Sequence, residues 1–145
     1  MTTATAARVE LKIPSRPEFI SVARLAVAAV ANRMGFDFDD IEDLKVATGE
    51  ALANAIQHAQ LSGRESDEYI VVVCALEAQA LVIEVRDSGA GFDPERRRQE
   101  LEEKEELGEG GMGLLLIEAL MDEVDFKTKP GKGTSVRMTK RLSGS

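Results

Sequence analysis

Apolar and polar positions recur with two different periods along the chain, and the period changes at prolines and glycines. Residues 7–13 read Ala-Arg-Val-Glu-Leu-Lys-Ile, a period-two pattern that predicts a strand with one buried face, which Pro14 ends. Apolar residues then recur at helical spacing from about Pro17 to Met34, and Gly35 follows as a candidate C-cap. The chain is therefore expected to open with a strand and a helix.

A second helix is predicted from Asp39 to about Gln60. Asp39 and Glu42 have the spacing of a capping box in which Asp takes the usual Ser/Thr position. An apolar stripe along one helix face predicts that this helix packs on the core. The stripe consists of Ile41, Leu44, Ala47, Ala51, Ala55 and Ala59.

The remaining pattern predicts four strands and one short helix. Two β-rich runs, Tyr69–Leu76 and Ala80–Arg86, are close enough to form an antiparallel hairpin. A short apolar helix, Leu114–Met121, precedes strands at Glu123–Thr128 and Thr134–Arg141. This order predicts an α+β fold, a two-layer sandwich with helices on one face of a mainly antiparallel mixed sheet.

Residues 93–110 differ from the rest of the chain because they are almost wholly charged. Leu101 and Leu107 are their only large apolar residues, so the segment can bury little surface. We expect a mobile lid here. The chain as a whole, residues 1–145, has the length of a single domain.

The charge balance disfavours direct binding to nucleic acid. The net charge is -8, with 26 acidic and 18 basic residues, whereas phosphate neutralisation requires a basic face. The lone Cys74 lies in an apolar run and is expected to be a buried thiol in a reducing compartment. With no secretory pattern and no run long enough to span a membrane, we expect a cytoplasmic protein.

Three polar residues of the second helix could carry chemistry. Glu50, Asn54 and His58 are spaced four apart, so they project from one edge of the helix, beside its apolar stripe. An Asn carbonyl is a hard oxygen ligand that suits Mg²⁺, and a carboxylate one turn away could accept the proton of an attacking hydroxyl. Taken alone, this spacing is common enough that solvated helix residues explain it more simply.

Two glycine segments could bind a nucleotide on which these helix residues would act. Asp87 leaves a strand and is followed by Gly89 and Gly91, where the backbone can turn sharply and a carboxylate could accept a hydrogen bond from an adenine amino group. An ordinary turn explains that segment about as well. Residues 108–113 form a glycine-rich segment before an apolar helix, where free N–H groups and the helix dipole favour a phosphate. A flexible hinge is the alternative there.

In this order the three elements resemble the nucleotide site of the GHKL ATPase and kinase superfamily, which has the Bergerat ATP-binding fold. The chain is most similar to the small bacterial serine-protein kinases that are also anti-sigma factors, of the general stress and sporulation type. The residues that carry this resemblance span nearly the whole chain. They are Ile13-Pro14, Pro17-Glu18-Phe19, Arg33-Met34-Gly35-Phe36, Ile41-Glu42-Asp43-Leu44-Lys45, Glu50-Ala51, Asn54-Ala55, His58-Ala59, Gly110-Gly111-Met112-Gly113-Leu114, Glu118, Leu120-Met121-Asp122-Glu123-Val124 and Met138-Thr139-Lys140.

The resemblance implies a role for each matching position, with ATP and Mg²⁺ as cofactors. Glu50 would be the general base, Asn54 the Mg²⁺ ligand and Asp87 the carboxylate that recognises adenine. The other implied nucleotide contacts are Gly89 and Gly91 in the first glycine box, Gly111, Met112, Gly113 and Leu114 in the second, and Thr134 near adenine. Related kinases dock partners on the first helix, which makes Arg24 a candidate partner contact, although a solvated arginine explains it equally well.

The function that the resemblance implies is an ATP-dependent protein serine kinase and anti-sigma factor. It would sequester an RNA polymerase sigma factor, phosphorylate a serine of an anti-anti-sigma antagonist, and form a homodimer. An activating switch kinase that does not bind sigma, and a nucleotide-regulated binding module without kinase activity, remain alternatives. A detached chaperone-type ATPase fits the short chain less well. A phosphoacceptor role for His58 is disfavoured because sensor kinases carry that residue on a separate helix pair.

Overall fold

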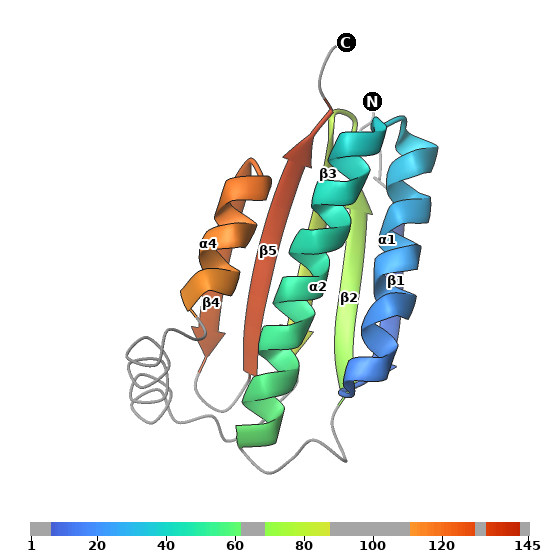
Figure 1. Ribbon diagram of the computed structural model, residues 1–145. Coiled ribbons are helices and arrows are strands. Elements are labelled where there is room, and N and C mark those ends of the chain that lie inside the picture. The colour runs from blue at the N-terminus through green and yellow to red at the C-terminus, as the bar shows by residue number, and fades with distance from the viewer. Residues whose placement is uncertain (1–6, 62–68, 88–110, 130–132, 143–145) are drawn as a thin grey trace.

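The structure is a computed structural model in which a five-stranded sheet carries three α-helices on one face, over the described residues 7–61, 69–87, 111–129 and 133–142 (Figure 1). The strands are β1 (Ala7–Pro14), β2 (Tyr69–Leu76), β3 (Ala80–Asp87), β4 (Glu123–Lys129) and β5 (Gly133–Arg141). The helices are α1 (Ile20–Met34), α2 (Phe38–Leu61) and α4 (Gly111–Leu120). The α+β class predicted from the sequence is confirmed.

The strands lie in the order β1-β2-β3-β5-β4, and all four described pairings are antiparallel. The hairpin predicted between β2 and β3 is present, closed by a hydrogen bond from the Glu77 N–H to the Ala80 carbonyl. β5 inserts between β3 and β4, so that Asp87 at the end of β3 pairs with Thr134 near the start of β5. This register brings two predicted site residues to the same end of the sheet.

The helices lie side by side, with α2 between α1 and α4 (Figure 1). α2 covers β3 and β5, while α1 packs on β2 and α4 on β4. The predicted stripe of α2 is buried at Leu44, Ala47, Ala51 and Ala55, because this face meets the sheet. α1 lies along one edge of α2 and α4 along the other. Polar residues of α2 beside its buried apolar stripe therefore face one of these helices as well as solvent.

The first two helices, α1 and α2, do not begin where the sequence predicts. Pro17 begins a short 3-10 turn, Pro17–Phe19, rather than α1 itself, which starts at Ile20. The Asp39 capping box is wrong: α2 begins at Phe38, and Asp37 caps it by accepting a hydrogen bond from the Asp40 N–H at 2.8 Å. Asp37 and Asp39 lie close together and both satisfy the capping pattern. Only the path of the turn before α2 decides which of them caps the helix.

The C-cap of α1 and the buried cysteine are as predicted. Gly35 has a φ of 96°, a left-handed conformation that favours glycine, and its N–H bonds to the Ala31 and Asn32 carbonyls. Cys74 is 3% exposed, and burial raises the pKa of its thiol to about 11. Such a thiol is unreactive near neutral pH.

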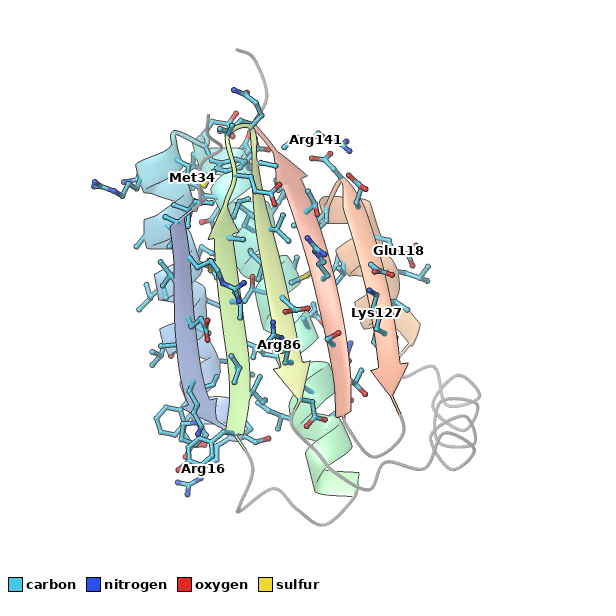
Figure 2. All side chains as sticks on the ribbon, turned by 180° about the vertical axis from the view of Figure 1, so that it is seen from behind. Arg16, Met34, Arg86, Glu118, Lys127 and Arg141 are labelled. Carbon is cyan, nitrogen blue, oxygen red and sulfur yellow. The ribbon has the colours of Figure 1, made fainter. Side chains whose placement is uncertain are left out.

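The face of the sheet turned away from the helices carries ion pairs (Figure 2). Arg86 pairs with Glu84 at 2.6 Å, and Lys127 pairs with Asp125 at 3.7 Å. These charged residues occupy the polar positions of the period-two pattern in their strands. They keep this face of the sheet in contact with solvent. Among the described helices, none has the length and apolar character needed to cross a membrane.

Candidate functional site

Glu50 and Asn54 lie on the edge of α2 that faces α4, and both are half-buried. Gly113 of α4 lies close to both side chains. A Cβ added at Gly113 would lie 3.1 Å from Glu50 Oε2 and 3.5 Å from each of the two amide atoms of Asn54. Only glycine lets the backbone of α4 come this close to the carboxylate without displacing it.

Residues 111–113 of the second glycine segment belong to helix α4, because that helix begins at Gly111 rather than at Leu114 and ends at Leu120 rather than Met121. Gly111, Met112 and Gly113 thus form its first turn, and the next residue, Leu114, is half-buried. The first N–H groups of an α-helix have no partner within the helix, and the dipole makes this end positive. A helix end of the kind that can bind an anion therefore lies against Glu50 and Asn54.

A shallow hollow lies between α2 and the sheet, and its space of about 240 Å³ includes open solvent. Its lining comes from α2, β3, β4 and β5 and is mostly apolar. The lining residues are Ala51, Asn54, Ala55, Val85, Asp87, Phe126, Thr134 and Val136. Three residues predicted to bind nucleotide, Asn54, Asp87 and Thr134, thus share one pocket.

Phe126 is a pocket residue that the sequence did not identify. It pairs with Val136 across β4 and β5, and Val136 pairs with Val85 on β3, so the three side chains form one row along the floor of the pocket. Phe126 is 40% exposed, so part of its side chain is accessible to a ligand in the pocket. The alternation of β4 placed Phe126 on a strand face, but only the sheet order placed it in this pocket.

The donor set of the pocket fits a magnesium nucleotide. Mg²⁺ takes few protein oxygens and keeps its remaining positions for water and phosphate. Asn54 offers an amide oxygen beside the free N–H groups of α4, and within the described ranges no group of three or more His, Cys, Asp or Glu could hold a metal alone. These residues could hold the ion only together with bound phosphates.

Several predicted features lie outside the described residues. They include Gly89 and Gly91 of the first glycine box and the lid at residues 93–110. His58 is described only through its backbone, which is part of α2. Their predicted roles therefore stay predictions.

Arg24 is half-buried against α2, on the side of that helix opposite α4 (Figure 1). A Cβ added at Gly49 would lie 3.4 Å from Arg24 Cδ, so the arginine stem rests on the helix turn that precedes Glu50. The Arg24 Nε is buried and has no hydrogen-bond partner within the described part of the chain. The side chain is thus more constrained than a solvated surface arginine.

Comparison with known families and relatives agrees with this geometry. Residues 13–140 match the family described as the histidine kinase-like ATPase domain. The chain is 42% identical over 142 residues to the serine-protein kinase RsbW of Bacillus velezensis, with 94% of this chain and 86% of the relative aligned. It is 43% identical to the RsbW of Oceanobacillus iheyensis, with 93% and 87% aligned.

Solved structures agree at the level of the fold. The RsbU and RsbW domains of a Mycobacterium tuberculosis protein superpose with a TM-score of 0.69 at 23% identity, covering 94% of this chain and 32% of that one. The SiaB–SiaC complex of Pseudomonas aeruginosa gives a TM-score of 0.70 at 18% identity, covering 90% and 88%.

Proposed function

Because the chain belongs to the histidine kinase-like ATPases, and among them to the RsbW serine-protein kinases, we propose that it is a kinase that controls a sigma factor. It transfers phosphate from ATP to a serine of an anti-anti-sigma protein. When not engaged with that antagonist, it binds and sequesters an RNA polymerase sigma factor.

The observation that carries the catalytic part of this proposal is the contact of Gly113 with Glu50 and Asn54. It sets an anion-binding helix end, a carboxylate and an amide oxygen within a few ångströms of one another. The adjoining pocket, with Asp87 and Thr134 at its end, suits a purine base. Together they are consistent with a nucleotide whose base lies in the pocket and whose phosphates reach α4.

Each residue then has a role that phosphoryl transfer requires. Glu50 accepts the proton of the attacking serine hydroxyl, and the first turn of α4 holds phosphate oxygens through its free N–H groups. Asn54 contributes the protein ligand to Mg²⁺, which neutralises phosphate charge when bound. Positioning and charge neutralisation account for most of the catalysis in this reaction class.

Arg24 is proposed as a contact for protein partners. It lies on α1 and rests on the turn of α2 that precedes Glu50, so a partner bound at α1 would approach the reacting groups from the side opposite α4. We also propose that the protein acts as a homodimer in the cytoplasm, as the family resemblance implies.

The test of the proposed function is Glu50→Gln, which keeps the shape of the side chain but removes the base. We expect nucleotide affinity within about 3-fold of wild type and phosphate transfer reduced about 100- to 10,000-fold, the usual contribution of a general base. Transfer from labelled ATP to a serine-bearing partner from the native host would be followed beside Glu118→Gln, which changes an exposed glutamate of α4 (Figure 2).

Two outcomes would contradict the proposal. Undiminished transfer by Glu50→Gln would remove Glu50 from the base role. Absence of phosphoserine in every partner, with tight nucleotide binding retained, would favour the binding module without kinase activity. Copurification of a sigma factor with the wild-type protein separates the anti-sigma kinase from a switch kinase that does not bind sigma.

A further inference from the structure

Lys140 occupies a position on β5 where an apolar residue is expected. It pairs with the fully buried Leu81 and follows Val136 and Met138 on the strand face that packs against the helices. Its side chain is only 12% exposed. Because Thr134 lies six residues earlier on β5, Lys140 is about 20 Å from the pocket end of the sheet.

Three acceptors from two helices surround the Lys140 ammonium. Lys140 Nζ donates a hydrogen bond to the carbonyl of Leu120, the last residue of α4, at 2.6 Å. It also lies 3.4 Å from Asp43 Oδ2 and 3.7 Å from Asp40 Oδ1, both near the start of α2. The Leu120 carbonyl and Asp43 are within hydrogen-bond distance of the ammonium, and Asp40 adds an ion pair.

The charges at this point alternate along the direction from α2 to α4. The positive N-terminal end of α2 meets the carboxylates of Asp40 and Asp43, these meet the Lys140 ammonium, and the ammonium meets the negative C-terminal end of α4. Each neighbouring pair is attractive. Lys140 therefore joins the two helices electrostatically at the end opposite the candidate site.

These two helices carry the groups proposed to react. α4 has ten residues and a length of about 15 Å, and a helix this short is marginal without tertiary contacts. Its first turn meets Glu50 and Asn54 at Gly113, and its last residue meets Lys140. Moving the far end of α4 would tilt the helix and change the separation between its first turn and Glu50.

We propose that Lys140 is a positioning residue for phosphoryl transfer, which holds the distal end of α4 to α2 so that the phosphate-binding turn keeps its spacing from Glu50 and Asn54. The inference rests on the proposed function of that site. It assigns Lys140 no contact with nucleotide or substrate.

The kinetic test compares Lys140→Met, which fills the space without charge, with Lys140→Arg, which retains charge and donors. We expect kcat for transfer to fall about 10- to 100-fold in Lys140→Met, since a displacement of about 1 Å can cost this much, with the nucleotide KM changed less than kcat. Lys140→Arg should restore most of the rate. Lys127→Met is the matched control, because Lys127 has an ion pair of the same 3.7 Å length but is 63% exposed and donates to no helix carbonyl within the described ranges.

A distance measurement tests the same inference without activity. Spin labels would be placed at the exposed positions Val46 on α2 and Leu115 on α4, in a Cys74→Ala background. Lys140→Met should shift or broaden the distance distribution between the labels, whereas Lys140→Arg and Lys127→Met should leave it unchanged. If Lys140→Met does not fold, Asp43→Asn removes one negative charge beside the ammonium and should cause a smaller change of the same kind.

Three results would overturn the inference: full transfer by a folded Lys140→Met, an equal loss in Lys127→Met, or an unchanged distance distribution. For Asp43→Asn, wild-type transfer with an unchanged distribution would do the same. The distance is measured without nucleotide or partner. It therefore decides the role of Lys140 even if no serine partner is ever phosphorylated.

Discussion

α1 and α4 flank α2 on the same face of the sheet, yet they are held in different ways. α1 has 15 residues and buries Ala23, Val27 and Ala31 completely, one side chain per turn along its length. α4 has ten residues, and Ile117 is its fully buried side chain, while Leu115 is 66% exposed. α1 is fixed by packing throughout, whereas α4 is held, among the side chains that the structure describes, by the buried Ile117 and by the contact of Lys140 with its C-terminal end.

α1 therefore mainly stabilises the fold, whereas α4 mainly contributes to the candidate site. A short element with few buried contacts has lower local stability than its surroundings, and its orientation responds to single contacts. α4 is also the helix whose first turn meets Glu50 and Asn54. Matched substitutions in the two helices should therefore both affect stability, but only those in α4 should also slow phosphate transfer.

The largest effect is expected from removing a buried anchor from each helix. Ile117→Ala should lower the free energy of unfolding by about 3 kcal/mol and Val27→Ala by about 2 kcal/mol, because each leaves a cavity. Only Ile117→Ala should also slow transfer per folded molecule. Denaturant unfolding and transfer assays at a temperature where both variants are folded would check this, and equal slowing in both would break the comparison.

The second effect concerns the two glycines at which α2 meets its neighbours. Gly113→Ala brings a Cβ within 3.1 Å of the Glu50 carboxylate, which must then move by a few tenths of an ångström, so we expect transfer to fall about 10- to 30-fold, less than the roughly 100-fold cost of a 1 Å misplacement. Gly49→Ala places its Cβ in ordinary contact with Arg24 and Ile20 and should stabilise α2 by up to about 1 kcal/mol. Full transfer by Gly113→Ala would show that the close approach is dispensable.

A smaller effect is expected at Phe126, which is 40% exposed in the pocket. Phe126→Ala should weaken nucleotide binding about 10-fold, since stacking of a base on an aromatic side chain contributes about 1–3 kcal/mol. Phe38→Ala removes an even more exposed ring at the start of α2, outside the pocket, and should leave affinity unchanged. Titration calorimetry with ADP would measure both, and equal affinities would remove Phe126 from the site.

The smallest effect is expected at the exposed leucines of the two helices. Leu115→Ala and Leu25→Ala should each change the free energy of unfolding by less than about 0.5 kcal/mol, because neither side chain is buried. A loss above about 1 kcal/mol for either leucine, measured by denaturant unfolding, would mean that the side chain is covered in solution and would revise the comparison of the two helices.

Most of the fold could be predicted because local periodicity reports which face of each element is buried. The alternation of residues 7–13 and the stripe of α2 led to the correct elements and the α+β class. Boundaries were less certain at the helix ends. Asp37 and Asp39 satisfy the same capping chemistry, and Gly111 can open a helix or precede one, so their positions depend on the path of the neighbouring turns.

The sequence by itself determined that Glu50 and Asn54 share one helix edge and that Asp87 ends a strand, because helix and strand periods fix such relations within an element. Only the tertiary structure decided that Gly113 meets Glu50, that Phe126 completes the pocket and that Lys140 joins α2 to α4. Those relations join elements distant in sequence. They depend on strand order and helix packing, which arise when the whole core is buried at once.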